Sequence, residues 1–262
     1  MKIKYRLLKI IITVVTLIFL LNFSLKKFNN RTITDRDIVV NFEQTIHPVY
    51  FISQKEIVNI VKKQNPRGKI KDINIPKLER EVRAFPAVDS ANVYLNLSGR
   101  LNVDIKQKVP VFRLKNSKGE VVYVDEKGSS FPMNTNFSYE CILVMGDVQP
   151  SEYKTLVEFV NTINKDEFYK KYFIGIEKKN NSYYLFTIDG NFKVELGELS
   201  NVDFKLKGFK TFMDKILIRE KMDKYSKISL KYNGQIVATR NKNAKMVDEE
   251  KEMIDKKEES KN

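Results

Sequence analysis

The stretch that most restricts the fold of this chain is Phe85–Leu114, which has the pattern of two strands joined by a turn. Apolar and polar residues alternate along both halves, and a period of two with one apolar side is typical of a half-buried strand. Ser98 and Gly99 separate the halves and supply the turn. The sequence therefore predicts a β-hairpin with one face on a core. The apolar residues of the alternation are Ala91, Val93, Leu95, Leu97, Leu101, Val103 and Ile105.

A short helix is predicted immediately before this hairpin. Pro76 occupies a position where the first turn of a helix tolerates a missing N–H group. Leu78, Val82 and Phe85 follow at spacings of four and three, which places them on one helical stripe. Pro86 ends the helix before the first strand begins. Helix, strand, turn and strand with a shared apolar face predict a small α+β module rather than a catalytic motif.

The N-terminal segment predicts a membrane anchor. Residues 1–6 are basic, and residues 7–25 are almost wholly apolar and approach the ~20 residues that a bilayer requires. A cleaved signal peptide is the alternative, but no small-x-small cleavage site follows Leu21. We therefore predict a cytoplasmic N-terminus followed by an uncleaved single transmembrane helix. A very short N-terminus before a large C-terminal part favours export of the bulk of the chain. Basic residues also follow the apolar segment, so the difference in positive charge between its two ends is small.

The first predicted domain follows a polar linker at residues 26–36. Alternating apolar residues at 38–42 predict a strand. Ser53 and Glu56 form a capping box, in which the serine caps a helix start and the glutamate reaches back to it. With the helix and hairpin described above, residues 37–108 have the order strand, helix, helix, strand, strand.

Residues 109–240 are predicted to form a second, strand-rich domain. Apolar stripes at 151–163 and 206–217 predict two helices within it. Asp189 and Gly190 form the kind of residue pair that accepts positive φ in a tight hairpin turn. The other predicted strands include residues 111–114, 121–124, 141–145, 173–177, 228–232 and 235–240.

The charge of the chain is strongly positive. Lys and Arg number 47 against 33 Asp and Glu, which gives a formal net charge of +14. A basic surface favours an acidic partner or anionic lipid, and ordinary solubility is the alternative explanation. Residues 241–262 are rich in Lys and Glu without aromatic residues, so we predict a charged, disordered tail there.

Several features argue against an enzyme. Cys141 and His47 are the sole cysteine and histidine of the sequence, so neither an intramolecular disulfide nor a His/Cys metal cluster is possible. The sequence contains no G-x-S-x-G, Walker or G-x-G-x-x-G motif. Cys141 lies in an apolar run and is predicted to be a buried small hydrophobic residue. We predict no enzymatic activity, no cofactor, no metal and no small-molecule substrate.

Nucleic-acid binding is a further alternative that the positive charge raises. Lys170, Lys171 and Tyr172 lie between Phe168 and Phe173, and basic and aromatic residues together can bind single strands. The cluster is short and fits the joint between a helix and a strand. We therefore predict that its aromatic residues belong to the core and that nucleic acid is not a partner.

Several strings of this sequence resemble one protein family. FPAVDSANVYL and LNVDIKQKVPVFRL resemble the end of the POTRA domain in the FtsQ/DivIB family of bacterial cell-division proteins. The V-D-x-x-G-x-x-F string at 124–131 is similar to the start of that family's β domain, and the hairpin and helix at 182–217 resemble a later part of it. The resemblance covers about residues 1–240. It implies an α+β fold with an N-terminal single transmembrane helix, a POTRA domain (β-α-α-β-β) and a mixed-sheet β domain with two helices.

The resemblance also implies a function. FtsQ-like proteins are scaffolds of the divisome that link early and late division proteins and bind an FtsB/FtsL-like pair of bitopic proteins, which controls septal peptidoglycan synthesis. The implied location is the plasma (inner) membrane at the septum, with the N-terminus cytoplasmic and the bulk extracytoplasmic. The alternative is a POTRA-containing protein of outer-membrane protein assembly or secretion. Such proteins carry a cleaved signal peptide and a long barrel, for which too little chain follows the module.

The predicted partner-binding site is at the end of the second domain. If the last strand lies at a sheet edge, it offers free N–H and C=O groups to a partner strand. Lys231 could contact an acidic group of the partner, and Tyr232 could pack against an apolar group. The alternative is that Lys231 is simply solvated and that Tyr232 lies in the core or at its rim. The chain has no tryptophan, unlike the final strand of other family members, so the contacts are expected to differ in detail. The predicted residues are Lys231, Tyr232, Gly234, Gln235, Ile236, Val237 and Ala238.

Overall fold

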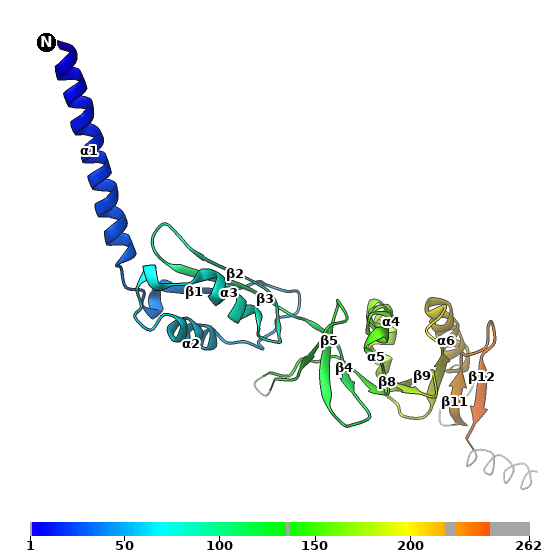
Figure 1. The fold of residues 1–262 in the computed structure, drawn as a ribbon. Coiled ribbons are helices and arrows are strands. Elements are labelled where there is room, and N and C mark those ends of the chain that lie inside the picture. Colours follow the sequence, from blue (N-terminus) through cyan, green and yellow to red (C-terminus); the bar gives the residue numbers. More distant parts are fainter. Residues whose placement is uncertain (1, 135–136, 218–223, 242–262) are drawn as a thin grey trace, which may run out of the picture. The chain divides into compact units, whose positions relative to one another are not determined.

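The structure is a computed structural model that describes residues 2–134, 137–217 and 224–241 (Figure 1). The chain divides into two compact units, Met1–Lys108 and Val109–Asn262. The predicted tail at 241–262 lies outside the described residues except for Asn241.

Unit 1 begins with a long apolar helix, α1 (Lys2–Asn29). Its span Tyr5–Asn29 has 25 residues and a mean hydropathy of 2.3, and its side chains are not covered by the rest of the protein. This helix has the length and composition of a single-pass membrane anchor. It runs beyond the predicted apolar segment, so the first part of the predicted linker is helical.

The rest of unit 1 has the predicted strand, helix, helix, strand, strand order. Its three-stranded sheet has the order β1-β3-β2, with β1 parallel and β2 antiparallel to β3. Two helices pack against each other and contact the sheet. The elements are β1 (Ile38–Phe42), α2 (Gln54–Gln64), α3 (Ile75–Arg83), β2 (Val88–Leu95) and β3 (Leu101–Gln107), with 3-10 turns η1 (Asp35–Asp37) and η2 (Ile70–Asp72).

Local signals account for both helices. The Ser53 hydroxyl accepts a hydrogen bond from the Glu56 backbone N–H, and the Glu56 carboxylate accepts one from the Ser53 N–H at 2.8 Å, which confirms the capping box. Asn74 caps α3 by accepting from the Lys77 N–H, and Pro76 lies in the first turn as predicted. The core between helices and sheet consists of Ile57, Val61, Leu78, Val82, Ala91, Val93, Leu101, Val103 and Ile105.

The predicted hairpin is confirmed, with one exception. Val93 pairs with Val103 and Leu95 with Leu101, so the alternating apolar residues share one face. Leu97 was predicted to continue this alternation, but its exposed fraction is 101%. The reason is that β2 ends at Leu95, and the following Asn96 side chain accepts from the Arg100 N–H at 2.9 Å and closes the turn.

Unit 2 is built on one nine-stranded mixed sheet of order β12-β11-β10-β9-β8-β7-β4-β5-β6. The pairs β4–β7, β7–β8 and β10–β11 are parallel, and the other pairs are antiparallel. The strands are β4 (Pro110–Lys115), β5 (Val121–Asp125), β6 (Ser130–Pro132), β7 (Ile142–Gly146), β8 (Phe173–Lys179), β9 (Ser182–Thr187), β10 (Lys193–Gly197), β11 (Tyr225–Ser229) and β12 (Val237–Arg240).

Helices of unit 2 lie along one face of this sheet (Figure 1). Two of them, α4 (Tyr153–Lys165) and α6 (Val202–Leu217), correspond to the predicted helices. The 3-10 turn η3 (Pro150–Glu152) precedes α4, and β10 precedes α6. A third, short helix, α5 (Glu167–Tyr172), was not predicted as a helix.

The basic and aromatic cluster lies on α5, and its rings belong to the core as predicted. Phe168 stacks on Tyr172 at 5.3 Å between ring centroids, and Tyr169 is buried. Tyr172 and Phe173 both contact Phe209 of α6, with ring centroids 6.0 and 5.5 Å from the Phe209 centroid. The aromatic side chains therefore pack α5 against α6 and the core of unit 2.

Candidate partner-binding edge

The strand β12 forms one edge of the nine-stranded sheet. It pairs with β11 in antiparallel register, with Val237 opposite Ser229 and Ala238 opposite Ile228. Among the described residues, no strand pairs with its other side. Because backbone groups alternate in direction along an antiparallel strand, part of the N–H and C=O groups of β12 face outward. This edge position is the condition that the predicted site required.

The connection before β12 is longer than predicted. The sequence indicated strands at 228–232 and 235–240 with a tight turn between them, but β11 ends at Ser229 and β12 begins at Val237. The Leu230 N–H still continues the pairing with β10 by donating to the Glu195 carbonyl at 2.7 Å, and residues 231–236 then form the loop to β12. Gln235 and Ile236 therefore belong to the connection rather than to the last strand.

The seven predicted residues lie in this connection and in β12, but their side chains fall into two groups. Tyr232 and Val237 are exposed, with exposed fractions of 55% and 44%. Ile236 and Ala238 are half-buried and pack against the core of unit 2. Ile236 approaches α6, since a Cβ atom at Gly208 would lie 3.7 Å from its Cδ1 atom. The inward residues hold the edge in place, and the outward residues are the ones that can contact a partner.

The remaining predicted residues, Lys231, Gly234 and Gln235, are exposed in the connection. Gly234 has a φ of 71°, and the Gln235 N–H donates to the Tyr232 carbonyl at 3.3 Å, so these residues form the tip of the hairpin. The stem of Lys231 lies over β10, because a Cβ atom at Gly197 would be 3.0 Å from Lys231 Cγ.

A buried carboxylate on β10, which β11 separates from the edge strand, was missed by sequence reasoning. Glu195 on β10 is buried and pairs with Lys227 on β11 at 3.0 Å. Burial acts to raise the pKa of Glu195, but the hydrogen bond and charge of Lys227 outweigh it and lower the pKa, with a smaller contribution from Lys231. The hydrogen bond to Glu195 in turn raises the pKa of Lys227. The two residues are far apart in the sequence, so no local pattern marks them.

This pair leaves the ammonium group of Lys231 available. Lys227 makes the hydrogen bond to Glu195, and within the described residues no ion pair is formed by Lys231. Exposed Lys231 and Tyr232 therefore give the loop before β12 a positive and an aromatic residue. These two residues suit a partner segment that carries an acidic and an apolar residue.

The sole histidine and the sole cysteine of the sequence belong to different units. Burial raises the pKa of the Cys141 thiol to about 12, against the opposing effect of Arg113, so the thiol is protonated at neutral pH. His47 is exposed in the loop after β1. In the described part of the chain, no three His, Cys, Asp or Glu residues are grouped so that they could hold a metal ion.

An apolar N-terminal helix, a POTRA-type order of elements and a mixed sheet with an open edge define the class as a POTRA protein with a membrane-anchor helix. Comparison with family models agrees: the model for the FtsQ/DivIB, C-terminal related domain matches residues 109–239, and that for the POTRA-like domain matches residues 36–106. The chain belongs to the FtsQ/DivIB family. No curated protein matches it.

This membership confirms the resemblance read from the sequence, and it supports a role in cell division with other division proteins as partners. FtsQ/DivIB proteins are a family of non-enzymatic division scaffolds. The match favours this role over outer-membrane protein assembly, which POTRA modules also serve. The seven partner-binding residues stay a prediction.

Proposed function

We propose that this protein is a divisome scaffold of the plasma membrane that performs no reaction of its own. α1 anchors it with the N-terminus in the cytoplasm, and the POTRA-like domain and unit 2 lie outside, at the division septum. It links early and late division proteins, and it binds an FtsB/FtsL-like bitopic complex and so controls septal peptidoglycan synthesis. The observation that carries this proposal is the edge of β12, which pairs with no second strand among the described residues, in a domain of the FtsQ/DivIB type.

The mechanism is addition of a partner strand to β12. Outward N–H and C=O groups supply main-chain hydrogen bonds, and exposed side chains supply specificity. Val237 and Tyr232 offer apolar contact area, and Lys231 offers a charge for an acidic residue of the partner. Anchoring of both proteins in one membrane raises their effective concentration, so a modest intrinsic affinity is sufficient for binding.

A photo-crosslinking experiment in native membranes tests this site. The full chain carries a photoreactive residue at Val237 or, as the control, at Ile174. Ile174 is similarly exposed, at 54%, but lies on β8, which is paired on both sides. We expect an adduct with a small bitopic division protein at Val237 and none at Ile174. Loss of that adduct at Val237, or the same adduct at both positions, would refute strand addition at β12.

A further inference from the structure

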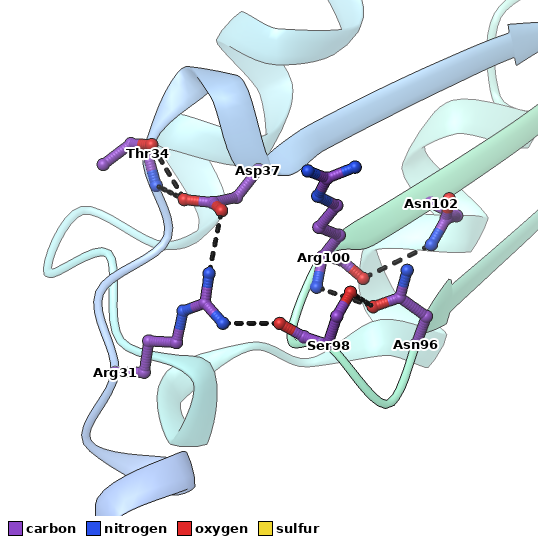
Figure 2. Close-up of polar contacts among 7 residues, drawn as sticks. All are labelled: Arg31, Thr34, Asp37, Asn96, Ser98, Arg100 and Asn102. Atoms are coloured by element: carbon purple, nitrogen blue, oxygen red, sulfur yellow. Dashed lines mark hydrogen bonds and ion pairs between the residues drawn. The ribbon is translucent and has the colours of Figure 1, made fainter.

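The segment between α1 and β1, expected to be a simple linker, is bound to the rest of unit 1. Arg31 donates to the Ser98 carbonyl oxygen at 2.5 Å and to the Asp37 carboxylate at 3.1 Å (Figure 2). The Arg31 carbonyl accepts from the Ile70 N–H at 3.1 Å. The β2–β3 turn and the η2 turn therefore both lie beside the end of α1.

The β2–β3 turn presents an apolar tip at this place. Leu97 directly precedes Ser98 and has an exposed fraction of 101%, so its side chain has no cover within the described residues. A single exposed leucine is common on soluble proteins. This one, however, is held next to the end of a helix of membrane-anchor type.

Basic residues lie on the three segments that meet at this place. They come from the last turn of α1, from the segment around η2 and from the β2–β3 turn, and no ion pair holds any of them in the part of the chain that the structure describes. Nearby Asp35 and Asp37 are already paired with Lys62 and Arg31, and exposed Asp72 is the acidic residue left on η2. The basic residues are Lys26, Lys27, Arg67, Lys69, Lys71 and Arg100.

These residues and Leu97 form what we call the junction face. The last residue of the apolar run is Leu25, and Arg31 is already bound to the domain. The four helical residues Lys26–Asn29 add about 6 Å, and two further residues add at most about 7 Å. A headgroup layer is roughly 5–7 Å thick, and the Debye length at physiological salt is about 8 Å. The junction face is thus within electrostatic reach of the bilayer that α1 would cross.

We propose that the junction face docks on the anionic headgroups of that bilayer, with Leu97 inserted among the lipids as an apolar anchor. Lysine and arginine attract anionic lipid, and an apolar side chain next to them adds interfacial binding. An open hollow of about 680 Å³ at the end of α1, lined by residues that include Phe23, Lys27 and Phe28, has the same mixed character. The consequence is a second membrane attachment, which fixes the orientation of the POTRA domain on the membrane.

The absence of tryptophan from the sequence makes a direct test possible. A single Leu97→Trp substitution in the full chain creates a unique fluorescent reporter at the tip. The protein is reconstituted in nanodiscs of phosphatidylcholine with phosphatidylglycerol, or of phosphatidylcholine alone. We expect a blue-shifted emission and quenching by brominated lipid in the discs with phosphatidylglycerol, and a marked loss of both in phosphatidylcholine or at high salt.

Two further reporters serve as controls. Ile46→Trp tests an equally exposed residue, at 95%, which follows β1 at the end of the sheet opposite the junction and should stay unquenched. Phe19→Trp lies within α1 and should be quenched in both lipids, which verifies insertion of the anchor itself. A failure of the anchor is therefore distinguishable from a failure of the junction face.

The charge requirement is tested in the Leu97→Trp background. Lys69→Glu together with Arg100→Glu should abolish the quenching, whereas Lys69→Arg together with Arg100→Lys should retain it. A Leu97→Trp reporter that stays unquenched while Phe19→Trp is quenched would overturn the proposal. Equal quenching of Leu97→Trp in both lipids, or after charge reversal, would overturn it as well.

Discussion

Glu152 joins three parts of unit 2 at a single carboxylate. It accepts hydrogen bonds from the Lys178 ammonium group at 2.6 Å and from the Tyr183 hydroxyl at 3.0 Å. Partial burial acts to raise the pKa of Glu152, but the bonds from Lys178, the Gln149 backbone and Tyr183 together lower it. A lowered pKa in the folded state means that the ionised form stabilises the fold. This stabilisation is present above the ordinary glutamate pKa and is lost as the pH falls through the lowered value.

We therefore expect Glu152→Gln to destabilise unit 2 at neutral pH by about 1–3 kcal/mol, because it leaves the nearly buried Lys178 without its charged partner. The deficit should shrink when the pH falls below the lowered pKa. The measurement is denaturant unfolding of the full chain at neutral and acidic pH. Glu126→Gln, at an exposed position of the same unit, is the control and should change little. An equal effect of both substitutions would argue against this role for Glu152.

Asp37 is the residue that keeps Arg31 in place at the end of α1. The Thr34 backbone N–H and hydroxyl both donate to its carboxylate and lower the pKa of Asp37. Burial opposes this shift, and Arg31 adds a smaller lowering effect. Because the pKa of Asp37 is lowered, as that of Glu152 is, this network is intact above the ordinary aspartate pKa. It is lost as the pH falls through the lowered pKa of Asp37.

The matching prediction concerns hydrogen exchange. Asp37→Asn should speed exchange at the amides of Ile33 and Ile70, which attach the segment after α1 to the domain. Asp35→Asn is the control, because its pair with Lys62 is exposed on both sides and such pairs contribute little. Unchanged protection in Asp37→Asn, or the same loss in Asp35→Asn, would mean that the Arg31 contacts do not depend on Asp37.

At the scale of elements, the direction of the backbone groups of β12 can be tested. The Asn241 N–H donates to the Lys224 carbonyl at 2.7 Å, so it points toward the β11 side. Because direction alternates along the strand, the N–H of Ala238 is expected to point outward, away from β11. Proline is tolerated at such positions of an edge strand, since it removes no hydrogen bond within the sheet.

Ala238→Pro should therefore keep the fold but weaken capture of the division partner by roughly 2- to 10-fold, the value of one main-chain hydrogen bond. Ala238→Val keeps the N–H and serves as the control. The measurement is recovery of the bitopic partner with the full chain from detergent-solubilised membranes, with circular dichroism as the check on folding. Full recovery with Ala238→Pro, or an equal loss with Ala238→Val, would contradict strand addition through this group.

Elements with local signals could be predicted from the sequence, and elements set by distant contacts could not. The capping box at Ser53 and Glu56 and the hairpin at Asp189-Gly190 depend on neighbouring residues, and both are confirmed. The end of β11 at Ser229 is set by pairing with Glu195 of β10 and Val237 of β12, which belong to other strands. The exposure of Leu97 depends on where the turn closes, and a period of two does not reveal that.

At the scale of the whole molecule, the order of parts was predictable because each part has its own pattern. An apolar span, a strand-helix-helix-strand-strand module and a strand-rich second domain are legible in sequence and agree with the family matches. The parallel pairing of β1 with β3 and of β10 with β11 brings together segments far apart in the chain, so no local pattern contains it. The position of β12 at the edge of the sheet follows from that pairing. The sequence alone therefore could not establish whether the predicted site lies at a sheet edge.

The most direct test of a division scaffold is the length and septation of cells depleted of this protein. We predict long filaments without septa, and restoration of normal division by a full-length copy that collects at mid-cell when fused to a fluorescent protein. Depleted cells of normal length with normal septa would contradict a division role. A loss of outer-membrane proteins in such cells would instead point to the assembly role that POTRA modules serve elsewhere.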